Sequence, residues 1–162
     1  MTIRAATKAD WNSIWPIFHE IVSAGDTYAY EPNITAEQAK TIWLEIPRKT
    51  FVIEVQGEIV GTYYIKTNQA GPGSHVCNCG YMVSSVARGK GLATQMCEHS
   101  QRVALELGYQ AMQFNFVAAS NRGAIRLWSR LGFETVGKLR NAFNHPQQGH
   151  IDAFVMYRWL AG

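Results

Sequence analysis

Hydrophobic residues along this chain follow two different spacings. In some segments they recur every three or four positions, the period of an amphipathic helix, and in others they alternate with polar residues, as in a half-buried strand. Helical spacing predicts helices over residues 7–22, 35–46, 92–107 and 124–131. Alternating or β-rich runs predict strands over residues 2–6, 51–55, 59–66, 75–83, 109–117, 133–139 and 151–160. Because three strands follow one another with no helix between them, we expect one mixed sheet with helices on both faces rather than a simple doubly wound fold.

Capping and turn residues set the expected boundaries of these elements. Thr7 and Asp10 are typical of a helix start, and Pro16 should kink or divide the helix that follows. Gln56-Gly57-Glu58 predicts a hairpin between two strands. An Asn, Pro, Gly and Gln-rich loop is expected over residues 140–150, between the last two strands.

The composition indicates a folded chain of ordinary domain size. It has 162 residues, of which 47% are hydrophobic and 17% charged, so we expect one domain over residues 1–162 with a substantial core. No apolar run approaches the length that spans a bilayer, and the first ten residues lack an apolar signal segment. The three cysteines lack the spacing of a disulfide framework. These features predict a cytoplasmic protein with no membrane partner.

Charge is distributed unevenly along the chain, although the net charge is only +3. Residues 59–133 carry seven Lys or Arg and only two acids, Glu98 and Glu106. This basic middle segment favours an anionic ligand over the alternative of a solvated helix face. Nucleic acid is disfavoured because the bases do not form one dense stripe interleaved with aromatic residues.

A glycine-rich turn joins the predicted strand 75–83 to the predicted helix 92–107. Gly89 and Gly91 allow backbone N–H groups to converge on an anion, and Arg88 and Lys90 add positive charge. The helix N-terminus adds unpaired donors and the positive end of its dipole. The spacing matches neither a dinucleotide fingerprint nor a Walker A loop, and an ordinary turn is the alternative. Strand, bases and helix together favour a pyrophosphate site.

Two segments in this order resemble motifs of the GNAT superfamily of acyl-CoA N-acyltransferases. Arg88-Gly89-Lys90-Gly91-Leu92-Ala93 is similar to the family's Q/R-x-x-G-x-G/A pyrophosphate motif. Residues 121–133, Asn-Arg-Gly-Ala-Ile-Arg-Leu-Trp-Ser-Arg-Leu-Gly-Phe, are similar to its N-x-x-A-x-x-L-Y-x-x-x-G-F segment. The resemblance covers nearly the whole chain and implies a mostly antiparallel mixed sheet, acetyl-CoA as cosubstrate and no metal.

The resemblance also implies which residues hold coenzyme A. Backbone groups of Met82 and Val83 would pair with the pantetheine arm, and Asn121 would hydrogen-bond the pantetheine or diphosphate region. Asn121 is equally suited to cap a helix, and Arg130 would either reach a CoA phosphate or form a surface ion pair. The pyrophosphate would be wrapped by a run of seven residues: Arg88, Gly89, Lys90, Gly91, Leu92, Ala93 and Thr94.

Acyl transfer from a thioester needs a neutral amine, stabilisation of the oxyanion and departure of a thiolate. A backbone N–H of the strand that ends near Val83 is the expected oxyanion donor. Many family members have a Tyr that protonates the leaving sulfur, but this chain has Trp128 at that place, and an indole N–H is not a useful acid. We interpret Trp128 as a pocket wall or a core residue.

Amides take the place of carboxylates in the strands expected to flank the acetyl group. No Asp or Glu lies between Glu58 and Glu98, whereas Asn78 and Asn115 fall in two of these strands. Amides cannot act as bases, but they can orient a carboxylate, an amine or a water. Each Asn is therefore either a structural amide or a catalytic ligand contact that positions and polarises the substrate.

A narrower resemblance concerns the same amides. Together with Asn121 and an Asn-Ala-Phe-Asn-His-Pro stretch at 141–146, Asn78 and Asn115 are similar to the fungal proline-analogue acetyltransferases, in which the matching Asn residues contact substrate or CoA. Phosphinothricin-type acetyltransferases are neighbours of this group. Three aromatic residues are expected in the acceptor pocket, namely Tyr28, Tyr30 and Phe143.

These features predict an N-acetyltransferase that moves the acetyl group from acetyl-CoA to the amine of a small amino or imino acid. Two alternatives remain open: a non-catalytic acetyl-CoA-binding sensor, and an acetyltransferase for peptide or protein N-termini. His145 and His150 lie in a loop without a nearby Cys or acid, so no metal site is expected. The resemblance also allows a homodimer through the exposed end of the sheet or the C-terminal strand.

Overall fold

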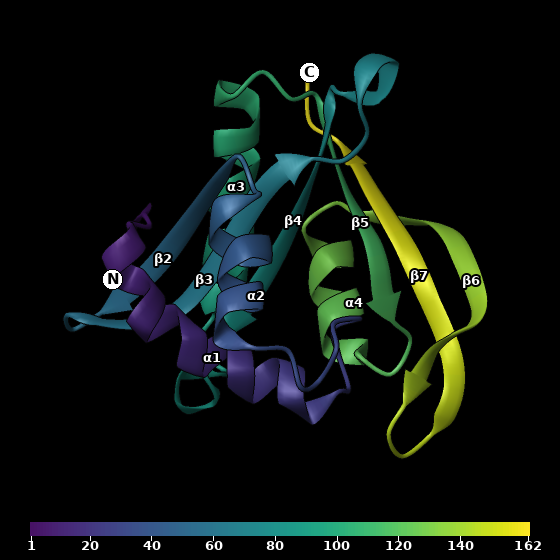
Figure 1. The fold of residues 1–162 in the computed structure, drawn as a ribbon. Coiled ribbons are helices and arrows are strands. Elements are labelled where there is room, and N and C mark those ends of the chain that lie inside the picture. The colour runs from purple at the N-terminus through teal and green to yellow at the C-terminus, as the bar shows by residue number, and fades with distance from the viewer.

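The computed structural model describes all 162 residues and contains one seven-stranded sheet, with strand order β1-β2-β3-β4-β5-β7-β6 (Figure 1). Neighbouring strands are antiparallel except β4 and β5, which are parallel. The strands are β1 (Thr2–Ala5), β2 (Lys49–Val55), β3 (Glu58–Thr67), β4 (Val76–Val83), β5 (Ala111–Ala118), β6 (Glu134–His145) and β7 (Gly149–Trp159). The main helices are α1 (Trp11–Ala24), α2 (Ala36–Lys40), α3 (Leu92–Glu106) and α4 (Arg122–Arg130). The predicted mixed, mostly antiparallel sheet is confirmed.

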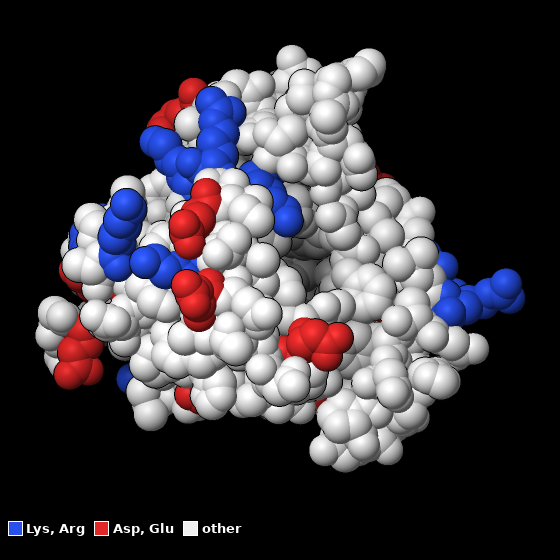
Figure 2. Space-filling view, in the orientation of Figure 1, with Lys and Arg blue, Asp and Glu red and all other residues white.

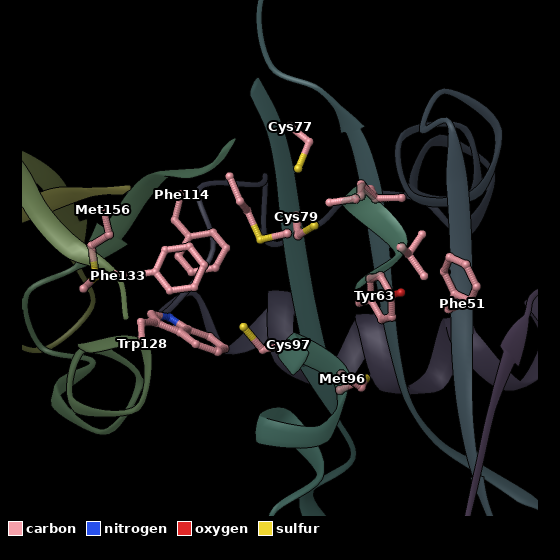
Figure 3. Packing of buried hydrophobic residues seen from close by; sticks show 14 of the residues in the cluster. Phe51, Tyr63, Cys77, Cys79, Met96, Cys97, Phe114, Trp128, Phe133 and Met156 are labelled. Atoms are coloured by element: carbon pink, nitrogen blue, oxygen red, sulfur yellow. The ribbon is translucent and has the colours of Figure 1, made fainter. Parts of the chain in front are cut away.

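Helices cover both faces of the sheet and enclose two hydrophobic cores. On one face α1 and α2 pack on the central strands, with Phe18 and Trp43 fully buried among their neighbours. On the other face α3 and α4 supply Met96, Cys97 and Trp128 to the larger core (Figure 3). All three cysteines are buried with free thiols. No helix combines the length and the apolar character that crossing a membrane requires.

The sheet opens between its two central strands. β4 and β5 pair only at Val76–Ala111 and Cys77–Met112, after which they separate (Figure 1). β5 stays paired with β7, although its register shifts between Phe114 and Val117. The second half of β4 therefore has a strand partner on one side only, and this opening positions the site described below.

Two expectations about the N-terminal helices need correction. α1 runs without interruption through Pro16, so the predicted division is wrong. Proline removes one backbone donor, but the residue four positions earlier, Asn12, is exposed, so water can satisfy its carbonyl. The helix expected over residues 35–46 is α2 followed by a π-helical turn, Thr41–Glu45, in which the Ile46 N–H donates to the Thr41 carbonyl at 2.8 Å.

The loop expected over residues 140–150 is mostly strand. β6 continues to His145, so only residues 146–148 connect it to β7. Asn141 takes a left-handed φ of 53°, and the register with β7 shifts between Leu139 and Phe143. Loop-forming residues fit here because β6 is the edge strand and is largely exposed, so a bulge and polar side chains cost little.

Arg4 ties the start of the chain to the first helical turn and to β2. Its guanidinium donates to Asp10 at 2.8 and 3.0 Å and to Glu54 at 2.7 Å. Asp10 also accepts the Thr7 N–H at 2.7 Å, which confirms the predicted capping interaction. The bonds from Arg4 lower the pKa of Asp10 from 3.8 to about 2.

We expect Asp10→Asn to destabilise the protein at pH 7 by about 1 kcal/mol, after allowance for solvent screening of the pair. Because the folded-state pKa of Asp10 is depressed, its contribution is complete above pH 4 and is lost as the pH falls toward 2. Urea unfolding at pH 7, 4 and 2.5 measures this. Wild-type and variant stabilities should converge at the lowest pH, and a constant gap between them would contradict the assignment.

Candidate active site

The main chain of β4 presents its peptide groups alternately to its two neighbours. The Val76 carbonyl accepts from Asn68 N–H at 2.9 Å, and the Ser84 N–H donates to the Val60 carbonyl at 2.8 Å, so even-numbered residues pair toward β3. By the alternation of a strand, the N–H and C=O groups of Tyr81 and Val83 face the opposite side, where β5 has moved away. An extended ligand can therefore pair with these two residues as an added strand.

This alternation changes one of the predicted cofactor contacts. Met82 belongs to the set that pairs with β3, where it lies opposite Thr62, and only 1% of it is exposed. Its peptide groups therefore turn away from the opening, contrary to expectation, while Val83 faces it as predicted from the resemblance. Tyr81, rather than Met82, faces the opening together with Val83. The sequence alone does not show this, because the side that each peptide group of β4 faces is fixed by the pairing with β3.

A cavity of about 270 Å³ lies where the two strands part. Figure 2 shows a hollow near the centre of the same view, where β4 and β5 diverge in Figure 1. Its polar lining residues are Thr27, Lys66, Asn78, Asn115 and Asn121, and no Asp, Glu or His lines it. Its aromatic walls are Tyr28, Tyr30, Tyr64, Tyr81, Phe114, Phe116 and Trp128.

Asn78 bridges the two strands at the point where they separate. It follows the last backbone pair, and its Nδ2 donates to the Gln113 carbonyl of β5 at 2.9 Å. Its Oδ1 accepts from the Tyr64 hydroxyl at 2.7 Å. Asn78 therefore has a structural role, because it is buried and its side chain is bonded to both Tyr64 and Gln113. The second N–H of its side-chain amide has no partner in the protein.

Asn115 lines the same cavity from the opposite strand. Its side chain is exposed, its Nδ2 donates to Asn68 Oδ1 at 2.7 Å, and its Oδ1 accepts from Gln113 Nε2 at 2.9 Å. The structure thus brings Asn78 and Asn115 to one cavity, from the two strands that diverge. Each amide makes two hydrogen bonds, but Asn115 is exposed and bonds only to other side chains, so it is the better position at which to test a role in binding.

Tyr28 and Tyr30 form one wall of the cavity, as expected. Their rings stack with centroids 5.5 Å apart, and the Tyr28 hydroxyl donates to the Tyr81 carbonyl at 2.7 Å. Burial raises the pKa of both phenols, so they remain neutral at physiological pH and do not act as bases.

Gly80 makes room for a third tyrosine in this wall. A Cβ on Gly80 would lie 2.6 Å from the Tyr64 ring and 3.3 Å from the Tyr28 hydroxyl oxygen. Only glycine lets the Tyr64 ring lie across β4 while its hydroxyl reaches Asn78. Tyr64 is a lining residue that the sequence did not single out, and its pairing opposite Gly80 is the feature that identifies it.

Trp128 both packs and lines the cavity, which supports its interpretation as a wall. Its ring centroid lies 5.1 Å from those of Tyr81 and Phe114, and the three aromatic residues close the α3–α4 side of the opening. Figure 3 shows the ring between Phe114 and Cys97. Phe143, by contrast, is not among the lining residues: it is buried on β6 near Phe116, because its segment is a strand rather than a loop.

Cys79 is the one nucleophilic thiol on the cavity wall. It is only 4% exposed, and burial raises the pKa of its thiol well above the ordinary value. A protonated thiol is a poor nucleophile, so this residue is an inert wall group.

The predicted anion loop has the required geometry. Gly89 and Gly91 both adopt left-handed backbone, with φ of 76° and 75°, and nothing lies near the position of their absent Cβ atoms. Helix α3 begins directly after Gly91, so the N–H groups of Leu92, Ala93 and Thr94 have no partner within the helix. Leu92 is buried in the larger core and anchors the start of the helix, so its side chain is not available to a ligand.

A second cavity, of about 490 Å³, lies between α1 and the end of β4. It is lined by Val83, Arg88 and Asn121, among others, and it shares Thr27, Tyr28, Tyr81 and Asn121 with the first. The two cavities thus adjoin across the opening of the sheet. The first lies toward Asn78, and the second reaches Arg88 at the start of the anion loop.

Known proteins match this chain over most of its length. A family model described as "Acetyltransferase (GNAT) family" matches residues 11–133. The chain belongs to the acetyltransferase (GNAT) family. It is therefore an N-acetyltransferase of the GNAT type, and acetyl-CoA is the donor that membership implies.

Individual relatives agree with this assignment. N-acetyltransferase aca1 of Schizosaccharomyces pombe is 35% identical over 151 residues, which cover 83% of this chain and 72% of that protein. The solved structure of a GCN5-related N-acetyltransferase from Kribbella flavida superposes with a TM-score of 0.93 at 40% identity, covering 98% of this chain and 97% of that one. A phosphinothricin acetyltransferase from Sinorhizobium meliloti, solved with acetyl-CoA, has a TM-score of 0.87 at 22% identity, covers 99% and 88% of the two chains, and shows the same fold.

Thr27 provides a test of whether the site fits the donor. Its Oγ1 is buried and has no hydrogen-bond partner, and Thr27 lines both cavities. A buried, unpaired hydroxyl is costly in a folded protein unless a ligand satisfies it. The free N–H of Tyr81, the free peptide groups of Val83, the glycine turn and this hydroxyl together match an extended acyl-CoA arm that ends in phosphates.

Asn121 and Arg130 lie at opposite ends of α4. Asn121 caps the helix, accepting from the Ala124 N–H at 3.3 Å, and it also lines both cavities, so both of its expected roles are compatible with its position. Arg130 is nine residues further on, roughly 13 Å along the helix axis, in a groove against Glu98 and Arg102 of α3. It forms no ion pair, and the structure separates it from Asn121.

We expect Thr27→Val to have opposite effects on the free and the liganded protein. Removing the unpaired hydroxyl should stabilise the free protein by about 1 kcal/mol. It should weaken acetyl-CoA binding about five- to tenfold, because a ligand hydrogen bond is lost. Thermal unfolding and calorimetric titration measure the two effects. Thr135→Val, exposed on β6, is the matched control, and unchanged acetyl-CoA affinity in Thr27→Val would refute the assignment.

Proposed function

We propose that the protein acetylates the amine of a small amino or imino acid by direct attack on acetyl-CoA in a ternary complex. The observation that carries this proposal is the cavity at the opening of the sheet. Its volume of about 270 Å³ lies just below the usual range of small-molecule sites, which begins at about 300 Å³, and suits a small acceptor better than a peptide terminus. Its lining combines aromatic walls with two strand amides that can orient a polar acceptor.

The donor would extend along the free side of β4. Tyr81 and Val83 would pair with its pantetheine arm, and Arg88, Lys90 and the N–H groups of residues 91–94 would bind its diphosphate. Asn121 would contact the arm at the N-terminus of α4. This arrangement directs the acetyl group toward the cavity that contains Asn78 and Asn115.

The acceptor amine would attack in its neutral form. Because no carboxylate or imidazole lines the cavity, deprotonation falls to solvent, and orientation supplies most of the acceleration. The amine lone pair forms the C–N bond, the C–S bond breaks, and the sulfur leaves as a thiolate, whose thiol has an ordinary pKa of about 8.5. The proton left on the nitrogen passes through solvent to that thiolate, which leaves a neutral amide and free coenzyme A. The main-chain N–H of Cys79, on the open side of β4, would stabilise the oxyanion. An acyl-cysteine route is disfavoured because Cys79 is buried and its burial raises the pKa of the thiol.

Imino acids are the acceptor class that the amides favour. The resemblance to proline-analogue acetyltransferases rests on Asn78, Asn115 and Asn121, and all three line this one cavity. The apolar ring of such an acceptor would lie against the stacked Tyr28 and Tyr30, and its polar groups would face the amides.

Release of free thiol from acetyl-CoA, measured across cyclic imino acids, small amino acids and short peptides, tests this function. We expect turnover with an imino or amino acid and at least a hundredfold lower kcat/KM with peptides. Asn115→Ala should lower kcat/KM for the acceptor about tenfold and leave the KM for acetyl-CoA unchanged. Asn144→Ala, exposed on β6 outside the cavity, is the control. Coenzyme A binding without thiol release from any amine would instead support a non-catalytic sensor.

Trp128→Phe should keep kcat within about threefold of wild type. A phenyl ring preserves most of the wall, and the lost indole N–H is not an acid at these pH values. Steady-state kinetics with saturating acetyl-CoA measures this, and Trp128→Ala, which leaves a cavity, should instead destabilise the protein by about 3–5 kcal/mol. A hundredfold fall in kcat for Trp128→Phe would show that the indole N–H takes part in the transfer.

A further inference from the structure

Lys66 is the only side chain with a formal charge among the 18 residues that line the acceptor cavity. It lies near the end of β3, and its backbone pairs opposite Asn78 of β4. Strand alternation places Tyr64 and Lys66 on the same face of β3, which is the face of Asn78. The charge is therefore built into the cavity wall beside the amide that bridges the opening.

The ammonium group of Lys66 has no anionic partner in the protein. Its Nζ lies 5.3 Å from the centroid of the Tyr64 ring, and it takes part in none of the three ion pairs. It also donates no hydrogen bond to another side chain or to the main chain, whereas neighbouring Asn78 and Asn115 are both engaged. The Tyr64 ring directs the lysine stem while leaving its three N–H donors free.

A half-buried cation without a counterion favours a ligand that supplies one. Charge-assisted hydrogen bonds to a carboxylate are among the strongest polar contacts in proteins, and they strengthen as the site closes around a ligand. The same cation repels a second positive charge, which disfavours diamines and other polycationic acceptors. The cavity contains no acid that would reverse this preference.

We infer that Lys66 binds the carboxylate of the acceptor and so determines both its class and its orientation. This inference rests on the proposed function and names the residue that recognises the carboxylate of its amino or imino acid acceptor. One N–H of Asn78 on β4 and one of Asn115 on β5 carry no bond in the protein, so both amides can add hydrogen bonds to the carboxylate. When Lys66 of β3 holds the carboxylate, the amine of the acceptor points across β4 toward the opening that Tyr81 faces.

The experiment compares an acceptor acid with its own carboxamide, for example proline or azetidine-2-carboxylate with the matching amide. The wild type should prefer the acid at least tenfold in kcat/KM. Lys66→Met, which keeps the stem and removes the charge, should raise the KM for the acid about 10- to 100-fold with kcat changed less than threefold. It should leave the carboxamide and the KM for acetyl-CoA unaffected. Lys66→Arg should restore most of the preference, and Lys138→Met, exposed on β6, is the control.

A second measurement separates this inference from the proposed function. Calorimetric titration of the N-acetylated acid and of its carboxamide into the CoA-loaded protein reports binding without turnover. The acid should bind the wild type at least tenfold more tightly than the carboxamide does, and Lys66→Met should remove that difference.

The outcomes are distinct. Equal losses for acid and carboxamide in Lys66→Met, or no loss for either, would overturn the role of Lys66 while leaving the acetyltransferase intact. If no amine is turned over, the proposed acceptor class fails, and the titration still decides whether Lys66 binds a carboxylate.

Discussion

The structure depends on the separation of β4 from β5 directly after the Cys77–Met112 pair. Within a sheet, unpaired peptide groups are costly, so a gap between two central strands persists only if something else satisfies or covers them. Asn78 does this at the start of the gap by replacing a backbone bond with a side-chain bond to the Gln113 carbonyl. Further along, the Tyr28 hydroxyl satisfies the Tyr81 carbonyl. The remaining groups are left for a ligand, and both cavities adjoin there.

Aromatic side chains keep the opening from collapsing. Tyr81, Phe114 and Trp128 pack against one another on the side of α3 and α4, and Tyr28, Tyr30 and Tyr64 line the side of α1 and α2. Large rigid rings support a gap with little loss of side-chain entropy. Buried phenols with raised pKa also keep the wall neutral, which leaves Lys66 as the one fixed charge inside it.

Local chemistry made much of this site predictable. The glycine turn and the helix start at Asn121 follow from residue type and spacing, and the family resemblance implied that Asn78 and Asn115 lie on strands beside the acetyl group. The sequence could not show whether Met82 or Tyr81 faces the opening, because this depends on how β4 pairs with β3. Lys66 and Tyr64 were missed for a related reason: their place in the wall comes from pairing with Asn78 and Gly80. Residues 140–145 fold as an edge strand despite their loop-like composition, because pairing with β7 outweighs local preference.

Gly80 affects both the width of the cavity and the hydrogen bonds of Asn78 at the point where β4 and β5 separate. The Tyr64 ring occupies the space where a Cβ on Gly80 would stand, and the same ring carries the hydroxyl that holds Asn78. Any larger residue at position 80 would displace the ring and loosen the bridge at once. Positions 64 and 80 therefore form an epistatic pair, and a lineage that reshapes this pocket for a bulkier substrate must exchange both together.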